Sequence, residues 1–166
     1  MSHSKAKLGV LTATALGALV TLWPAVDPAW AAGPFRPFLG SWRGTGAITG
    51  SDGRREPISC RATYESDDEQ SLSQSLVCAS DSFRLNIECR ASAEGGQLQG
   101  QWRETTRNVE GTLSGEIGRG DFEGQVQGSG FTAQISLRVG GKKQAVHIQP
   151  SAGDIQSVDI VLTRSR

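Results

Sequence analysis

Histidine, methionine and aromatic side chains are scarce in this chain of 166 residues. There are two histidines and one methionine, and aromatic residues make up 6% of the sequence. His147 is the only histidine after His3, which excludes metal sites built on several histidines. The three cysteines include no Cys-x-x-Cys pair, the spacing that redox-active dithiols commonly use. The sequence therefore predicts no metal site and no dithiol redox centre.

An excess of charge is also absent. Lysine and arginine together number 17, as do aspartate and glutamate, and the basic residues form no long run. Proteins that bind nucleic acid usually gather basic and aromatic side chains on one face, and proteins that bind anionic membranes carry a polybasic segment. We expect neither nucleic acid nor an anionic membrane surface as a partner.

Residues 1–31 have the pattern of a secretory signal peptide. Two lysines precede the uncharged stretch 8–23, and Ala29 and Ala31 supply the small side chains required before a cleavage site. The uncharged stretch is shorter than the roughly 20 residues that span a bilayer. No cysteine lies near the cut, and no Arg-Arg pair precedes the apolar run. We expect a signal-peptide helix cleaved after Ala31, no stable membrane anchor after processing, and a periplasmic or secreted protein.

The remaining sequence favours an all-β fold. Short runs of alternating apolar and polar residues are separated by glycine, serine and aspartate, and no helical period is sustained. The strands are expected near 40–49, 55–65, 70–79, 82–91, 96–105, 108–117, 119–127, 130–139, 142–149 and 155–164. With no helix to cover a sheet edge, we predict a single antiparallel up-and-down barrel of about 8–10 strands. Residues 32–39 would form an extended N-terminal segment before a barrel domain at 40–166.

Alternation also predicts which side chains face inward. The aromatic residues of this set are candidates for the lining of a ligand site: Trp42, Tyr64, Trp102, Phe122 and Phe131. A repeated Gly-x-apolar-x-Gly-x-apolar motif places Gly100, Gly115 and Gly124 on the same face. Inward glycines have two interpretations. They allow the sharp coiling of a small barrel, or they leave space for an apolar cavity.

The cysteines share the parity of the inward residues. A hairpin centred on Glu69 places Cys60 directly opposite Cys78, whereas Cys89 is offset from Cys78 along the next hairpin. Export permits disulfide formation. We therefore predict a Cys60–Cys78 disulfide and a buried, free Cys89.

Catalytic residues are hard to find. His147 alternates with apolar neighbours so as to point outward, and no strand-turn-helix nucleophile elbow accompanies it. Glu104 shares the face of Trp102 and is the one carboxylate that is a candidate for burial. Since neither residue has a partner in the pattern, we expect no catalytic residue and no enzymatic activity.

The segment 38–46 contains Gly-x-Trp-x-Gly-x-Gly and resembles the opening of calycin barrels, both lipocalins and nitrobindin-type barrels. The resemblance implies that Arg164 stacks on Trp42 if the first and last strands pair. The nitrobindin comparison would also imply haem on a histidine in the closing strands, but His147 points outward and the final strand has no histidine. No cofactor is therefore expected.

The rest of the chain resembles a group of exported alphaproteobacterial proteins, through residues 60–62, 78–80, 102–104 and 130–133. That resemblance implies no particular activity. We expect a non-enzymatic binding module that holds a small apolar ligand in the barrel or at its mouth. The alternative is a periplasmic protein partner, bound by a proteinase-inhibitor-like or other protein-interaction barrel. Residues 33–37 would then be a binding segment, or else a lid across the barrel end.

Overall fold

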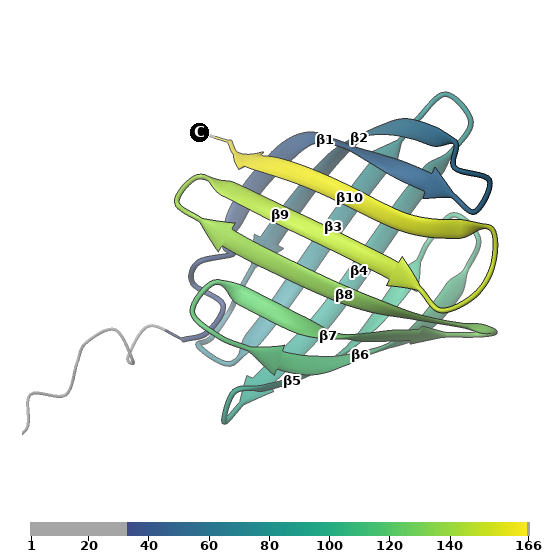
Figure 1. Cartoon of the computed structure of the whole chain (residues 1–166). Coiled ribbons are helices and arrows are strands. Elements are labelled where there is room, and N and C mark those ends of the chain that lie inside the picture. Colours follow the sequence, from purple (N-terminus) through teal and green to yellow (C-terminus); the bar gives the residue numbers. More distant parts are fainter. Residues whose placement is uncertain (1–32, 166) are drawn as a thin grey trace, which may run out of the picture.

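Ten consecutive antiparallel strands form a closed barrel in the computed structural model, which describes residues 33–165 (Figure 1). Each strand pairs with its neighbours in sequence, and β1 closes the barrel on β10. The strands are β1 (Gly40–Gly50), β2 (Arg55–Glu65), β3 (Ser71–Ala79), β4 (Arg84–Glu94), β5 (Gln97–Glu104), β6 (Val109–Ile117), β7 (Asp121–Gly128), β8 (Phe131–Gly140), β9 (Lys143–Pro150) and β10 (Ile155–Arg164).

The expected all-β barrel is confirmed, and each strand lies within a few residues of its expected position. In β2, Ile58, Cys60, Ala62 and Tyr64 are buried and mostly alternate with exposed residues, so the period of two gives the barrel an apolar interior and a polar exterior. The expected signal peptide at 1–31 lies outside the described residues. Within residues 33–165, no helix is long and apolar enough to span a membrane.

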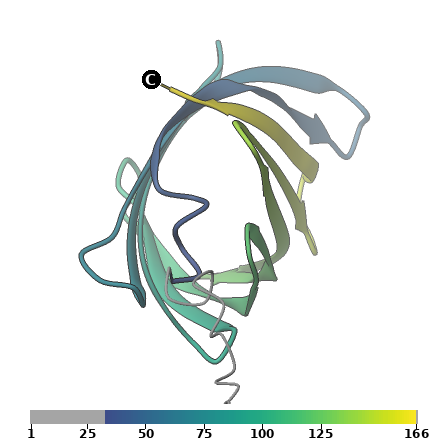
Figure 2. The ribbon, with the colours of Figure 1, turned by 90° about the vertical axis from the view of Figure 1, so that its left-hand side faces the viewer.

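Residues 33–39, called the plug here, close one end of the barrel. Figure 2 looks toward this end, where the plug crosses the opening. Phe35 and Phe38 are buried, and the backbone N–H of Phe38 donates to the carbonyl oxygen of Phe35 over 2.9 Å. The backbone therefore turns through residues 33–38, in place of the extended segment expected from the sequence, because two phenylalanines must enter the same apolar space.

Arg164 fastens the plug to the last strand. Its guanidinium donates to the carbonyl oxygens of Leu39 and Pro37, the latter over 2.6 Å. The same group lies 4.2 Å from the centroid of the Trp42 ring, which confirms the expected stacking. Trp42 in turn donates from Nε1 to the carbonyl oxygen of Phe38 over 2.7 Å. The plug is thus bound by both strands at the seam of the barrel.

The repeated glycines lie where neighbouring strands approach closely. Gly115 of β6 is paired with Gly124 of β7, and a Cβ on Gly115 would lie 2.5 Å from the Cα of Gly124. No side chain could be accommodated at that distance. The geometry supports the coiling interpretation for this pair, while the cavity described below is lined by the side chains around them.

Candidate ligand cavity

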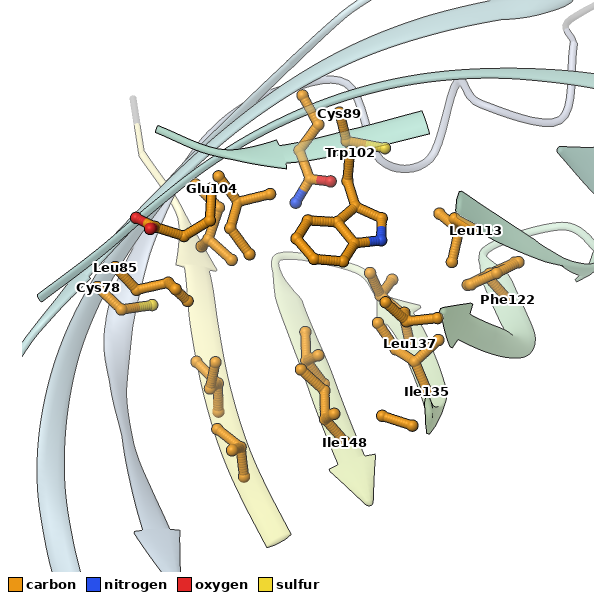
Figure 3. A pocket seen from close by; sticks show the side chains of 18 of the residues that line it. Cys78, Leu85, Cys89, Trp102, Glu104, Leu113, Phe122, Ile135, Leu137 and Ile148 are labelled. Atoms are coloured by element: carbon orange, nitrogen blue, oxygen red, sulfur yellow. The ribbon is translucent and has the colours of Figure 1, made fainter. Parts of the chain in front are cut away.

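The barrel encloses a cavity of about 460 Å³. Side chains from all ten strands and from the plug line it, and nearly all of them are apolar. Figure 3 shows the indole of Trp102 projecting into this space, with Leu113, Phe122 and Leu137 facing it from other strands. A volume of this size falls in the range of small-molecule sites, roughly 300–1,000 Å³.

Four of the five aromatic candidates line the cavity: Tyr64, Trp102, Phe122 and Phe131. Trp42 does not belong to the lining. It is buried between Arg164 and the backbone of Phe38 instead. Its side chain therefore holds the plug in place, which alternation along β1 does not reveal.

The cavity reaches solvent at the end opposite the plug. Phe131 and Ile155 both line it and are 38% and 36% exposed, although large apolar side chains are usually buried. Phe83, Arg107 and Pro150 line the cavity in the same region, where the strands end. We call these five residues the mouth.

Glu104 is buried next to the mouth. Its Oε1 accepts hydrogen bonds from the backbone N–H groups of Asn86 and Thr106, both over 3.1 Å, and its Oε2 accepts one from that of Arg107 over 2.7 Å. Burial alone would raise the pKa of Glu104, but hydrogen bonds from Asn86, Arg107 and Thr106 outweigh it and lower the pKa to about 2. The carboxylate therefore stays ionised and fixes the β5–β6 turn.

Arg107 connects two turns of the mouth. Its guanidinium carbon lies 5.0 Å from the centroid of the Phe83 ring, in the β3–β4 turn. One of its nitrogens donates to the carbonyl oxygen of Arg84 over 3.2 Å and lies 3.6 Å from Glu104. These contacts hold the β3–β4 and β5–β6 turns together on one side of the opening.

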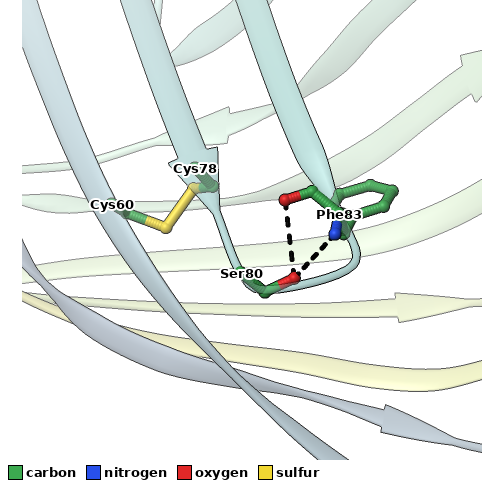
Figure 4. Close-up of a disulfide and its surroundings, with 4 residues drawn as sticks. All are labelled: Cys60, Cys78, Ser80 and Phe83. Carbon is green, nitrogen blue, oxygen red and sulfur yellow. Dashed lines mark hydrogen bonds between the residues drawn. A yellow bond between two sulfur atoms is a disulfide. The ribbon is translucent and has the colours of Figure 1, made fainter.

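The predicted disulfide joins Cys60 to Cys78, which are directly paired across β2 and β3 (Figure 4). Just beyond it, two hydrogen bonds close the β3–β4 turn. The backbone N–H of Ser80 donates to the carbonyl oxygen of Phe83 over 2.8 Å, and the backbone N–H of Phe83 donates to Oγ of Ser80 over 2.9 Å. The disulfide therefore fixes the end of β3, which leads into the turn that holds Phe83 at the mouth. Cys89 is free and buried, as expected.

A row of polar residues crosses the otherwise apolar wall. Tyr64, Gln74 and Cys89 are paired in succession across β2, β3 and β4, and all three line the cavity. We call them the polar row. Gln74 was not among the predicted site residues, although it has the same inward parity as Leu72 and Leu76 in the sequence.

The members of the polar row are uncharged at neutral pH. Burial raises the pKa of Tyr64, whose hydroxyl lies 3.3 Å from Oε1 and 3.2 Å from Nε2 of the buried Gln144. Burial also raises the pKa of Cys89 to about 11. Cys89 is therefore a protonated thiol at pH 7 and lacks the nucleophilicity and metal affinity of a thiolate.

These side chains do not fit the haem site that the nitrobindin resemblance implies. No histidine belongs to the cavity lining. His147 is exposed on the outer face, with Nδ1 2.7 Å from Oδ1 of Asp159. Tyr64 is engaged with Gln144, and Cys89 is protonated. Within residues 33–165, no three His, Cys, Asp or Glu side chains are arranged to hold a metal ion.

Solved structures share this fold. Rv2717c from M. tuberculosis aligns with a TM-score of 0.66 at 16% identity, over 84% of this chain and 99% of the other. The S-type phycobiliprotein lyase CPES from Guillardia theta aligns with a TM-score of 0.56 at 12% identity, over 80% and 90% of the two chains. At these identities the likeness establishes the barrel fold alone. No protein-family model and no curated protein matches the sequence.

Proposed function

We propose that this protein is an exported, non-enzymatic binding protein that takes up a small apolar molecule through the mouth and holds it in the barrel. The observation that carries the proposal is the apolar cavity of about 460 Å³, closed by the plug at one end and open at the other. Transfer of an apolar ligand from water into such a space is favourable by about 25 cal/mol per Å² of apolar surface buried.

Export is supported by the disulfide, which persists in oxidising compartments. A non-enzymatic role is supported by the chemistry of the lining. Its one ionised carboxylate, Glu104, is occupied by backbone donors, and its thiol has a raised pKa. Neither group is poised to exchange a proton near pH 7.

The proteinase-inhibitor alternative depended on a free N-terminal segment. Phe35 and Phe38 are buried in their own barrel, and Arg164 binds the carbonyl oxygens of Pro37 and Leu39. A segment held in this way is not offered to a protease. The plug therefore favours the ligand-binding proposal over the inhibitor alternative.

The test is binding of the neutral fluorescent probe N-phenylnaphthylamine. We expect saturable binding by the wild-type protein, and an affinity lowered about tenfold or more by Ala91→Phe, which corresponds to about 1.4 kcal/mol. Ala91 lines the cavity, so the added ring would occupy ligand space. Ala145→Phe is the matched control, because Ala145 is exposed on β9. No saturable binding, or equal loss in both variants, would contradict the proposal.

A further inference from the structure

Gln74 is an uncharged polar residue in the cavity lining. It lines the cavity between Leu72 and Leu76 on β3. A glutamine amide can donate two hydrogen bonds and accept two. Within residues 33–165, the side-chain amide of Gln74 makes no hydrogen bond. An amide group in an apolar cavity is unfavourable unless a ligand or water pairs with it.

The neighbours of Gln74 make its position selective. It is paired with Tyr64 on one side and with Cys89 on the other, at cross-strand separations of roughly 5 Å between Cβ atoms. Tyr64 is already bonded to Gln144. When Gln144 Nε2 is the donor, the Tyr64 hydroxyl keeps its own proton for a second partner. A ligand atom bound by Gln74 therefore has a second hydrogen-bonding group beside it.

Among the described residues that line the cavity, the two charged side chains belong to Glu104 and Arg107, and neither is on a strand position paired with Gln74. Tyr64 and Cys89 are neutral, and the charged cavity residues Glu104 and Arg107 lie at the mouth, within 3.6 Å of each other. Arg107 is further engaged by Phe83 and by the carbonyl oxygen of Arg84. An ionised ligand group beside Gln74 would lose its hydration without gaining an opposite charge.

We propose that the bound molecule is an apolar compound with one uncharged hydroxyl, carbonyl or amide group, and that the side-chain amide of Gln74 binds this group. The inference rests on the proposed function and defines its ligand class. Apolar surface supplies the affinity, and Gln74 discriminates between compounds of the same shape.

Calorimetric titration with naphthalene, naphthol and naphthoate tests the inference, because the three share one apolar body and differ in their polar group. The wild-type protein should bind naphthol about threefold to tenfold more tightly than naphthalene. Naphthoate should bind more weakly than naphthol. In Gln74→Leu the preference for naphthol over naphthalene should fall to less than about twofold, with naphthalene binding retained.

Gln101→Leu is the matched control, because Gln101 is exposed on β5 next to Trp102; it should keep the wild-type preference. The inference is overturned if Gln74→Leu keeps the preference, if the wild-type protein shows none, or if naphthoate binds most tightly. In those cases, binding of naphthalene to the wild-type protein would still support the proposed function. If none of the three compounds binds the wild-type protein, the proposed function fails, and this inference fails with it.

Discussion

The rings of Trp102 and Phe131 lie against each other, with 5.7 Å between their centroids, although two strands separate them. Register explains the contact. Trp102 is paired with Gly111, Gly111 with Gly128, and Gly128 with Phe131. Because Gly111 and Gly128 lack side chains, the two rings extend over these positions from opposite sides and contact each other there. One side of the cavity near the mouth is therefore an aromatic surface built on two glycines.

Gly111→Ala should destabilise the barrel and displace the Trp102 ring. A Cβ on Gly111 would collide with the carbonyl oxygen of Gln127 and would lie 2.7 Å from the indole. Overpacking of this kind typically costs about 1–3 kcal/mol. Urea unfolding measures the loss, and near-ultraviolet circular dichroism should report the altered indole environment. Gly140→Ala is the control, since a Cβ there meets no atom within 4 Å. Equal stability of the two variants would contradict this account.

Alternation and turn chemistry were sufficient to predict the strands, because inward and outward residues alternate along them and every turn but one contains glycine, serine or aspartate. The exception is the β5–β6 turn at residues 105–108, which ends in Asn108 with a positive φ of 54°. The same parity placed Cys60 opposite Cys78. It could not distinguish Trp42, which binds the plug, from Trp102, which lines the cavity, because that difference depends on how residues 33–39 fold back.

Parity was also insufficient to predict the partners of the inward polar side chains. Parity placed Glu104 inward, but its hydrogen bonds to turn amides depend on backbone geometry that alternation does not specify. Gln74 and Gln144 both point into the barrel, and only the three-dimensional arrangement pairs Gln144 with Tyr64. The side chain of Gln74 makes no hydrogen bond within the part of the chain that the structure describes. The fold could therefore be predicted from local pattern, whereas the hydrogen bonding of the site depends on contacts between distant strands.

Loss of the disulfide should lower stability through the unfolded state. Cys60 and Cys78 are 18 residues apart, and cross-linking a loop of that length contributes about 3 kcal/mol in the chain-entropy model. Cys60→Ala combined with Cys78→Ala should lose that amount under oxidising conditions and be insensitive to reductant. Cys89→Ala should retain the wild-type dependence on reductant. A wild-type protein whose unfolding free energy ignores reductant would refute the bridge.

Arg164→Ala should release the plug. The variant loses two charged hydrogen bonds to carbonyl oxygens and the contact with Trp42, together about 2–4 kcal/mol. Hydrogen exchange should accelerate at residues 33–39 more than in the strands. Arg138→Ala is the control, because that side chain is 72% exposed and pairs with Glu123 at the surface, where an ion pair contributes less than about 1 kcal/mol. Uniform acceleration over the whole barrel would contradict a specific role in holding the plug.

Glu104 should make stability depend on pH below neutrality. Its folded-state pKa of about 2 lies below the roughly 4.3 of an unfolded glutamate. Between these values the unfolded chain binds more protons, so stability rises with pH. The contribution is complete above about pH 5 and is lost as pH falls toward about 2. Glu104→Gln should cost about 2–3 kcal/mol at pH 7, since an amide nitrogen would face backbone donors.

The measurement that isolates this effect is the difference in unfolding free energy between wild type and Glu104→Gln at several pH values. That difference should shrink from about pH 5 to about pH 2, because protonation of the wild-type carboxyl removes the same charge that the substitution removes. Glu110→Gln is the matched control: its carboxylate is exposed and pairs with Arg103 over 3.2 Å, so its effect should stay below about 1 kcal/mol at every pH. A difference for Glu104→Gln that stayed constant over this range would mean that the buried carboxylate does not stabilise the mouth through its charge.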